Sequence, residues 1–238
     1  MIRLEHVHKR FDGNDVLRGV DLELRRGRSL VVIGASGSGK SVLMKSILGL
    51  VRPDRGRITF DGELLAGGQR RMFLDRFGML FQAAALFDSL PVWQNVAFRL
   101  LRRMPRAEAH AIAIRKLDRV GLSEDVADRL PAELSGGMQK RAGLARAIAA
   151  DPEILFFDEP TTGLDPVMAG VINRLIRDIV SETGAMALTI THDMTSVRTI
   201  ADEVALLQDG VIHWQGDVAA MDRASDPQLT RFITGQQS

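Results

Sequence analysis

The segment Gly34–Ser41 constrains this chain more than any other. It reads GASGSGKS and matches the pattern G-x-x-x-x-G-K-S. The apolar run 29–33 precedes it and the amphipathic pattern of 42–50 follows it, so strand, loop and helix come in the order that a phosphate-binding loop requires. Loop N–H groups then face inward and the helix adds its positive N-terminal end. The motif predicts a nucleoside triphosphate site whose members are Gly34, Ala35, Ser36, Gly37, Ser38, Gly39, Lys40, Ser41 and Val42.

Two side chains of this motif have expected roles. Lys40 reaches the β- and γ-phosphates, and the Ser41 hydroxyl coordinates Mg²⁺. The predicted ligands of the chain are therefore ATP and Mg²⁺.

Composition limits the other classes of function. The chain has 238 residues with 31 basic and 30 acidic side chains, and a net charge of +1 provides no global field for nucleic acid. Cysteine is absent, which excludes disulfides and thiolate metal sites. No apolar signal-peptide core is visible at the N-terminus, and no stretch approaches the ~20 apolar residues that span a bilayer. We expect a cytoplasmic α/β protein.

The remaining pattern predicts one domain over 1–238 with a P-loop NTPase core. Alternating apolar and polar residues at 2–7 and 16–24, joined by a turn at 12–15, predict an N-terminal antiparallel β-subdomain. Residues 83–130 are helical by period and lack core strands. We therefore assign 1–82 and 151–238 to the catalytic core and 83–150 to an inserted helical subdomain.

The inserted segment is rich in basic residues between Arg99 and Arg119. A basic helical face is usually a solvated surface, and contact with lipid headgroups or an acidic partner is the alternative. The residues concerned are Arg99, Arg102, Arg103, Arg106, Arg115, Lys116 and Arg119.

Polar side chains follow three apolar strand patterns directly. Gln82 follows 77–81, Asp158 and Glu159 end the run from Ile154, and His192 follows 186–191. Ligands of open α/β sheets bind at the carboxyl ends of the strands. We expect Asp158 to hold Mg²⁺, Glu159 to deprotonate the attacking water and His192 to hydrogen-bond the γ-phosphate. Capping or solvated turns are the plain structural alternatives.

Two further features bear on the nucleotide. Phe11 ends the first strand, where an aromatic ring can stack on a purine or simply pack. The segment 134–138, LSGGM, opens a helix for which Ser135 is a suitable N-cap. This is a second anion-binding helix end, and one nucleotide rarely needs two from the same subunit. The surplus suggests a dimer in which each subunit completes the site of the other.

Together these motifs, in this order and spacing, resemble the ATPase subunit of ATP-binding-cassette (ABC) transporters over nearly the whole chain. In that family two ATPases enclose two ATP molecules head to tail. The resemblance implies that Ser135, Gly136 and Gly137 bind the partner's nucleotide and that Asp165 lies at the dimer seam. It also implies that Phe11 stacks on adenine and that Gln82 links the γ-phosphate and metal site to the membrane subunit. The catalytic set is then Lys40, Gln82, Glu159 and His192, and the metal set is Ser41, Gln82 and Asp158.

One departure narrows the resemblance. The signature commonly ends in Gln, whereas this chain has Met138. LSGGM, the segment 81–90 and the residues 140–142 are similar to the Mla and toluene-tolerance branch, whose members serve phospholipid transport. This similarity implies a homodimeric ATPase with a permease, an MCE-domain protein and a small STAS-domain protein as partners. It also implies a place on the cytoplasmic face of the inner membrane of a Gram-negative bacterium, where the complex maintains outer-membrane lipid asymmetry.

Three alternatives have distinguishable signatures. An ABC importer of a small polar solute would share every motif and differ in its membrane partner. A DNA-repair or chromosome ATPase would carry a coiled-coil or zinc insertion between Gln82 and Leu134, and the sequence has neither. A small-molecule P-loop kinase would lack the LSGG segment and would produce ADP only with a second substrate.

Overall fold

The computed structural model describes residues 1–235, which form two compact units. The first consists of Met1–Asp75 and the part of the chain from Met186 onward, and the second consists of Arg76–Ala185. Each unit contains strands and helices, consistent with the expected α/β class. Among the described residues, no helix has both the length and the apolar character needed to cross a membrane.

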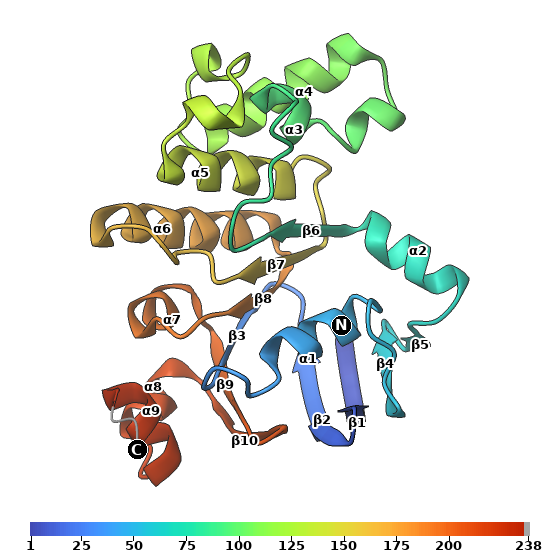
Figure 1. Ribbon diagram of the computed structural model, residues 1–238, viewed down its shortest axis with the longest axis vertical. Helices are drawn as coiled ribbons and strands as arrows, with labels where there is room; N and C mark the ends of the chain where they lie inside the picture. Colours follow the sequence, from blue (N-terminus) through green and yellow to red (C-terminus); the bar gives the residue numbers. More distant parts are fainter. Residues whose placement is uncertain (236–238) are drawn as a thin grey trace. The chain divides into compact units, whose positions relative to one another are not determined.

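An antiparallel sheet forms the N-terminal part of the first unit. Its strand order is β2 (Asn14–Leu24), β1 (Ile2–Phe11), β4 (Arg55–Phe60) and β5 (Glu63–Leu64) (Figure 1). Ile2 and Leu4 of β1 are buried in the alternation that the sequence pattern predicted, and a register shift after Leu4 makes Val7 the next buried residue. The turn is shorter than predicted, because Asp12 and Gly13 alone form it with φ of 45° and 89°. Two positive φ values suit the tight hairpin turn that matches strand twist.

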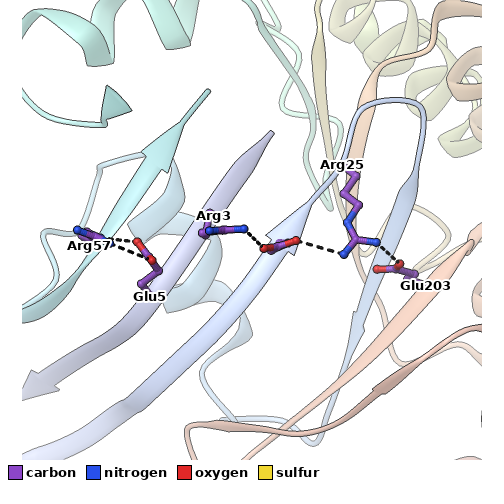
Figure 2. A network of polar contacts seen from close by, with 6 residues as sticks. Arg3, Glu5, Arg25, Arg57 and Glu203 are labelled. Carbon is purple, nitrogen blue, oxygen red and sulfur yellow. Dashed lines mark hydrogen bonds and ion pairs between the residues drawn. The ribbon is translucent and has the colours of Figure 1, made fainter. Parts of the chain in front are cut away.

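Charged pairs run across the solvent face of this sheet, and Figure 2 shows them as one row. Hydrogen bonds from arginines lower the pKa of Glu5, through Arg57, and of Glu23, through Arg25 and Arg3. The row extends from β4 across β1 and β2 to the start of β9. Its ion pairs are Arg57–Glu5, Arg3–Glu23 (2.5 Å), Arg25–Glu23 (3.2 Å) and Arg25–Glu203 (3.6 Å).

A second group of strands in the first unit is mostly parallel. β3 (Ser29–Ile33) pairs in parallel with β8 (Met186–Ile190) and β9 (Glu203–Gln208), and β9 pairs antiparallel with β10 (Val211–Gly216). Every residue of β3 and β8 is buried, which explains why both strands are apolar apart from Ser29 and Thr189. The helices of this unit are α1 (Lys40–Ile47), α2 (Gly68–Asp75), α7 (Met194–Ile200), α8 (Val218–Arg223) and α9 (Pro227–Thr234).

The second unit contains the parallel pair β6 (Phe77–Leu80) and β7 (Ile154–Asp158). Helix α5 (Gly136–Ala147) contacts β6, and it also contacts α3 (Val92–Val96) and α4 (Arg106–Arg119) (Figure 1). A longer helix, α6 (Pro166–Thr183), follows β7. Residues 83–130 form helices, 3-10 turns and loops and no strand, as predicted from their periodicity.

Buried and charged side chains order the helical segment of this unit. Asn95 is fully buried, accepts a hydrogen bond from the Phe87 N–H and donates to the carbonyls of Phe87 and Leu90. Several basic side chains of the segment have partners within the unit. They are Arg99 on the Phe77 carbonyl, Lys116 on Asp151, Arg119 on Glu182, Arg102 over the Phe98 ring and Arg106 over the Trp93 ring.

Candidate functional site

In the first unit, the phosphate loop leads from β3 into α1 and closes around its own lysine. The Lys40 ammonium donates to the carbonyl oxygens of Gly34 at 2.7 Å and Ala35 at 2.8 Å. Gly39 precedes the helix with φ 103° and ψ 3°, and no side chain caps α1. First-turn N–H groups without a side-chain cap are suited to an anion, since they carry the positive end of the helix dipole.

Close backbone packing makes Gly34 obligatory in this loop. Its φ is +155°, and a Cβ added there would lie 2.2 Å from the Leu207 carbonyl oxygen and 2.7 Å from the Ser38 Oγ. Gly37 differs, because its φ is +79° but a Cβ would meet nothing within 4 Å. The two glycines therefore serve different needs: one permits close approach to β9, and the other permits the turn.

A cavity of about 1040 Å³ lies beside the loop within the same unit. Its lining includes Ala35, Ser36, Gly37 and Ser38 of the phosphate loop together with His192. The Oγ of Ser38 is buried and has no hydrogen-bond partner among residues 1–235. A buried polar atom without a partner next to an open cavity fits an incoming acceptor such as a phosphate oxygen. The first unit thus places the expected phosphate loop and His192 at one cavity.

Other walls of this cavity were missed in the sequence. They come from β2, from the β9–β10 turn and from α9, and include Val16, Arg18, Asp209 and Arg231. Arg18 links β2 to the β9–β10 turn. Its main-chain N–H donates to the Gly210 carbonyl at 2.7 Å, and its Nε donates to the Asp209 carbonyl at 2.5 Å. These contacts join residues far apart in the chain, and no local motif marks them.

Phe11 lies outside the residues that line this cavity. Its ring is 40% exposed, and the Lys9 ammonium lies 5.1 Å from the ring centroid. A cation over one face leaves stacking to the other face. Phe11 is thus an exposed aromatic at the end of β1, as the sequence pattern indicated.

His192 is exposed, and the residue after it fixes the start of α7. Asp193 accepts hydrogen bonds from the Thr195 and Ser196 N–H groups and from the Ser196 hydroxyl. Burial by itself raises the pKa of Asp193, but these hydrogen bonds outweigh it and lower the pKa. The cap therefore fixes the main chain directly after His192.

In the second unit, the acidic pair lies at the end of β7. Asp158 and Glu159 are both half-buried, and Glu159 has a left-handed backbone with φ +46°. The Thr162 hydroxyl donates to the Glu159 Oε2 at 3.2 Å, and the Thr162 N–H donates to the Glu159 carbonyl at 3.2 Å. A non-glycine residue in this conformation is strained and persists only where neighbours hold it, which is common at functional sites. Thr162 orients the carboxylate expected to act as a base.

Gln82 lies in a loop whose main-chain carbonyls accept hydrogen bonds from side chains of α5. Ala84 and Ala85 have φ of 58° and 50°, and Arg146 donates to both of their carbonyls. Lys140 donates to the carbonyls of Gln82 and Glu159. Sequence reasoning missed both cations. The available signal was a lysine on the otherwise apolar, buried face of a predicted helix.

The LSGG segment begins α5, as the sequence predicted. Ser135 is the N-cap, and its Oγ accepts a hydrogen bond from the Met138 N–H at 3.3 Å. A Cβ on Gly137 would lie 2.7 Å from the Met168 Cε of α6. Asp165 caps α6 through the N–H groups of Val167 and Met168, both at 3.0 Å. The second unit therefore brings the signature glycine next to the helix that Asp165 caps.

The expected magnesium ligands are consistent with that ion by donor type. Ser41, Gln82 and Asp158 offer hydroxyl, amide and carboxylate oxygens, and Mg²⁺ prefers oxygen ligands and retains water and phosphate oxygens. Within residues 1–235, no group of three or more His, Cys, Asp or Glu side chains is arranged to hold a metal by itself. A site with one carboxylate suits a metal that arrives with its phosphates.

Comparisons with a family model and with known sequences agree on one family. Residues 17–162 match the ABC transporter family model. The chain is 38% identical to the Escherichia coli intermembrane phospholipid transport system ATP-binding protein MlaF, over 92% of this chain and 83% of that protein. It is 38% identical to protein TRIGALACTOSYLDIACYLGLYCEROL 3 of Arabidopsis thaliana, over 99% and 74%, respectively. It is also 36% identical to the probable ribonucleotide transport ATP-binding protein mkl of Mycobacterium leprae, over 99% and 69%.

Solved structures agree with this assignment. The ATP-binding cassette MJ0796, in a dimeric post-hydrolysis state with ADP and Pi, has a TM-score of 0.82 at 28% identity, over 92% of this chain and 99% of that one. The cbiO1 protein of Clostridium perfringens has a TM-score of 0.85 at 27% identity, over 99% and 94%. A match to the family model over more than half of the chain, together with relatives aligned over nearly all of it, is decisive: the chain belongs to the ABC transporter family and is an ATPase subunit of that family.

Proposed function

We propose that this chain hydrolyses ATP to drive phospholipid movement between the inner and outer membranes of a Gram-negative bacterium. The observation that carries this proposal is the 38% identity to MlaF across 92% of the chain, since MlaF is named for intermembrane phospholipid transport. The LSGGM signature and the sequence after Gln82 support the same branch. The ATPase would then act on the cytoplasmic face of the inner membrane.

The phosphate loop binds the nucleotide in this proposal. Lys40 already has its ammonium inside the loop, and the uncapped start of α1 supplies N–H donors for phosphate oxygens. Ser41, Gln82 and Asp158 hold Mg²⁺, which when bound neutralises phosphate charge and polarises the transferred group.

Hydrolysis depends on Glu159 and His192. The Glu159 carboxylate, oriented by Thr162, accepts a proton from the attacking water, and His192 donates a hydrogen bond to the γ-phosphate. The left-handed backbone of Glu159 is consistent with such a role, because strain of this kind is retained where function requires it.

A homodimer completes the site. The solved MJ0796 cassettes are dimers, and the exposed Ser135 and Gly136 form a second helix start that can bind the phosphates of a partner's nucleotide. Asp165 lies at the seam. Closure is driven by ATP, because the phosphate charges are fully neutralised only when both copies contribute. A permease, an MCE-domain protein and a STAS-domain protein are the expected partners.

Glu159→Gln tests the catalytic part of this proposal. Removal of the base slows hydrolysis by about a hundredfold or more and leaves ATP binding intact, so the variant accumulates as an ATP-bound dimer. Single-turnover hydrolysis and size-exclusion chromatography with and without ATP measure both effects. Glu182→Gln, an acid-to-amide change at a surface ion pair, is the matched control. A Glu159→Gln chain that turns over like wild type and stays monomeric would reject the role.

The cargo needs a separate experiment, because a second candidate has support. The mkl relative is named as a probable ribonucleotide transporter, and it aligns with 99% of this chain. The complex can be purified from its native membrane, and its bound small molecules and protein partners identified by mass spectrometry. Enrichment of phospholipid together with an MCE-domain partner is the expected result. Enrichment of nucleotides other than ATP and ADP, or of a polar solute, would favour the importer instead.

A further inference from the structure

Lys140 is a buried cation in the second turn of α5. The residue is 5% exposed. Its ammonium donates to the main-chain carbonyls of Gln82, at 2.5 Å, and of Glu159, at 3.3 Å. Gln82 follows β6 and Glu159 follows β7, two strands that pair in parallel. One side chain therefore joins two segments whose side chains have expected roles in hydrolysis.

Both segments have backbone conformations that need support. Glu159 has φ +46°, and Ala84 and Ala85, just after Gln82, have φ of 58° and 50°. Such non-glycine residues cost free energy and are retained where surrounding contacts over-determine them. Arg146 donates to the two alanine carbonyls, and Lys140 donates to the carbonyls of Gln82 and Glu159. The face of α5 that carries these two cations is thus a clamp on the loop after Gln82.

The chemistry of an ammonium suits this position. It has three donors and no acceptor, so it can bond two carbonyls and still interact with a third group. Burial lowers the pKa of Lys140, whereas the nearby charges of Asp158 and Glu159 raise it. A methionine of similar length fills the same space and makes none of these bonds, so the two contributions of the residue can be separated.

We propose that Lys140 is a positioning residue that fixes the main chain of Gln82 and Glu159 relative to α5 and thereby places their side chains for hydrolysis. This inference rests on the proposed ATPase function. α5 begins at the LSGG segment. A displacement of this helix therefore moves the main chain of Gln82 and Glu159 through the hydrogen bonds of Lys140, and their side chains move with it. Nucleotide affinity depends on the phosphate loop, which belongs to the first unit, whereas Lys140 belongs to the second.

Kinetic measurements on the full-length chain test this role. Lys140→Met should lower kcat by about a hundredfold, because small misplacement of catalytic groups has effects of that size, and should change KM less than about threefold. Lys140→Arg retains the charge and two donors and should restore most of kcat. Lys116→Met is the matched control, since that lysine forms a surface ion pair with Asp151, and it should leave kcat and KM unchanged.

Amide hydrogen exchange tests whether Lys140 holds the two loops, and this measurement does not depend on ATPase activity. Lys140→Met should accelerate exchange at 82–85 and 159–162 by about tenfold, with Lys140→Arg near wild type and the rest of β6 and β7 unaffected. If Lys140→Met does not fold, Lys140→Gln, whose amide can reach one carbonyl, takes its place with the same two measurements.

The outcomes separate this inference from the proposed function. Wild-type protein without ATPase activity would contradict the proposed function, and the exchange data would still decide whether Lys140 holds the two loops. Unchanged exchange in both loops, or a kcat within twofold of wild type for Lys140→Met, would overturn the positioning role. A parallel rise in KM and loss of kcat that arginine does not restore would show a general structural defect and would overturn it as well.

Discussion

At the scale of single residues, the phosphate loop depends on one close backbone approach. Gly34 lies against the Leu207 carbonyl of β9, where a Cβ would come within 2.2 Å of the oxygen. Real Cβ atoms do not approach oxygen so closely, so strand or loop must move to admit a side chain. The consensus glycine at the start of the motif is thus a packing requirement here as well as a source of inward N–H groups.

This contact predicts a difference between two glycines of one loop. Relative to wild type, we expect Gly37→Ala to lower the free energy of unfolding by about 1 kcal/mol, from backbone strain alone, and Gly34→Ala by about 3 kcal/mol, from strain and overpacking together. Urea denaturation without nucleotide measures both. Equal losses for the two variants would show that the contact with Leu207 has no energetic consequence.

Sequence could reveal some functional residues and not others for a physical reason. The phosphate loop and the Asp158–Glu159 pair are visible because their residue types are contiguous and follow apolar runs. Lys140 and Asn95 have main-chain carbonyls as partners, and such acceptors exist at every residue and leave no mark in a sequence. Only the unfavourable burial of a charge or an amide on an apolar helix face hints at them.

At the scale of elements, N-caps distinguish helices that begin with a side-chain cap from helices that begin without one, which among the described residues include α1, α3 and α4. Serine or aspartate caps begin α5, α6 and α7, whereas α1 starts after Gly39 with no side-chain cap. A side-chain cap accepts from only one or two of the first N–H groups of a helix, at α5 from the Met138 N–H alone, and the others stay open to a ligand. The open start of α1 is where the sequence predicts phosphate.

Two roles of Asp165 can be tested separately: capping α6, and contributing to the seam of the proposed dimer. Asp165→Ala removes acceptors for the Val167 and Met168 N–H groups and should lower the free energy of unfolding by about 1 kcal/mol. Asp165→Asn caps as well and should retain wild-type stability. Chemical denaturation measures stability, and ATP-dependent dimerisation of Asp165→Asn measures the seam. An alanine variant as stable as wild type would contradict the cap.

Element boundaries were predicted where caps or turns are strong. The start of α5 follows Ser135, the N-cap expected from the LSGG segment, and the β1–β2 hairpin turns within the expected range 12–15. Helices α2, α7 and α8 were not anticipated. α2 is strongly polar and buries Phe73 alone, and α8 buries Met221 alone, so neither has the apolar period that identifies a helix.

At the scale of the whole molecule, most of the described carboxylates with a lowered pKa lie in the first unit. In the first unit they are Glu5, Glu23, Asp54, Asp61, Asp193 and Asp226, and in the second unit the described residues include Asp125. A carboxylate whose pKa is lower in the folded protein stabilises it above the unfolded-state pKa. That stabilisation disappears as the pH falls through the folded-state pKa.

Acid should therefore affect the first unit before the second. Unfolded carboxylates titrate near pH 4, so stability should fall below about pH 4.5, by a modest amount because exposed pairs are weak.

The two tryptophans report separately, since Trp214 lies in the first unit and Trp93 in the second. In moderate urea, Trp93→Phe should show an acid transition at higher pH than Trp214→Phe, monitored by emission wavelength because His110 lies against Trp93 and alters its intensity. The two variants are first matched by their urea midpoints at pH 7, and 0.5 M salt should narrow the difference in the way that screening weakens surface pairs. Coincident transitions would mean that the uneven distribution of these carboxylates does not control acid unfolding.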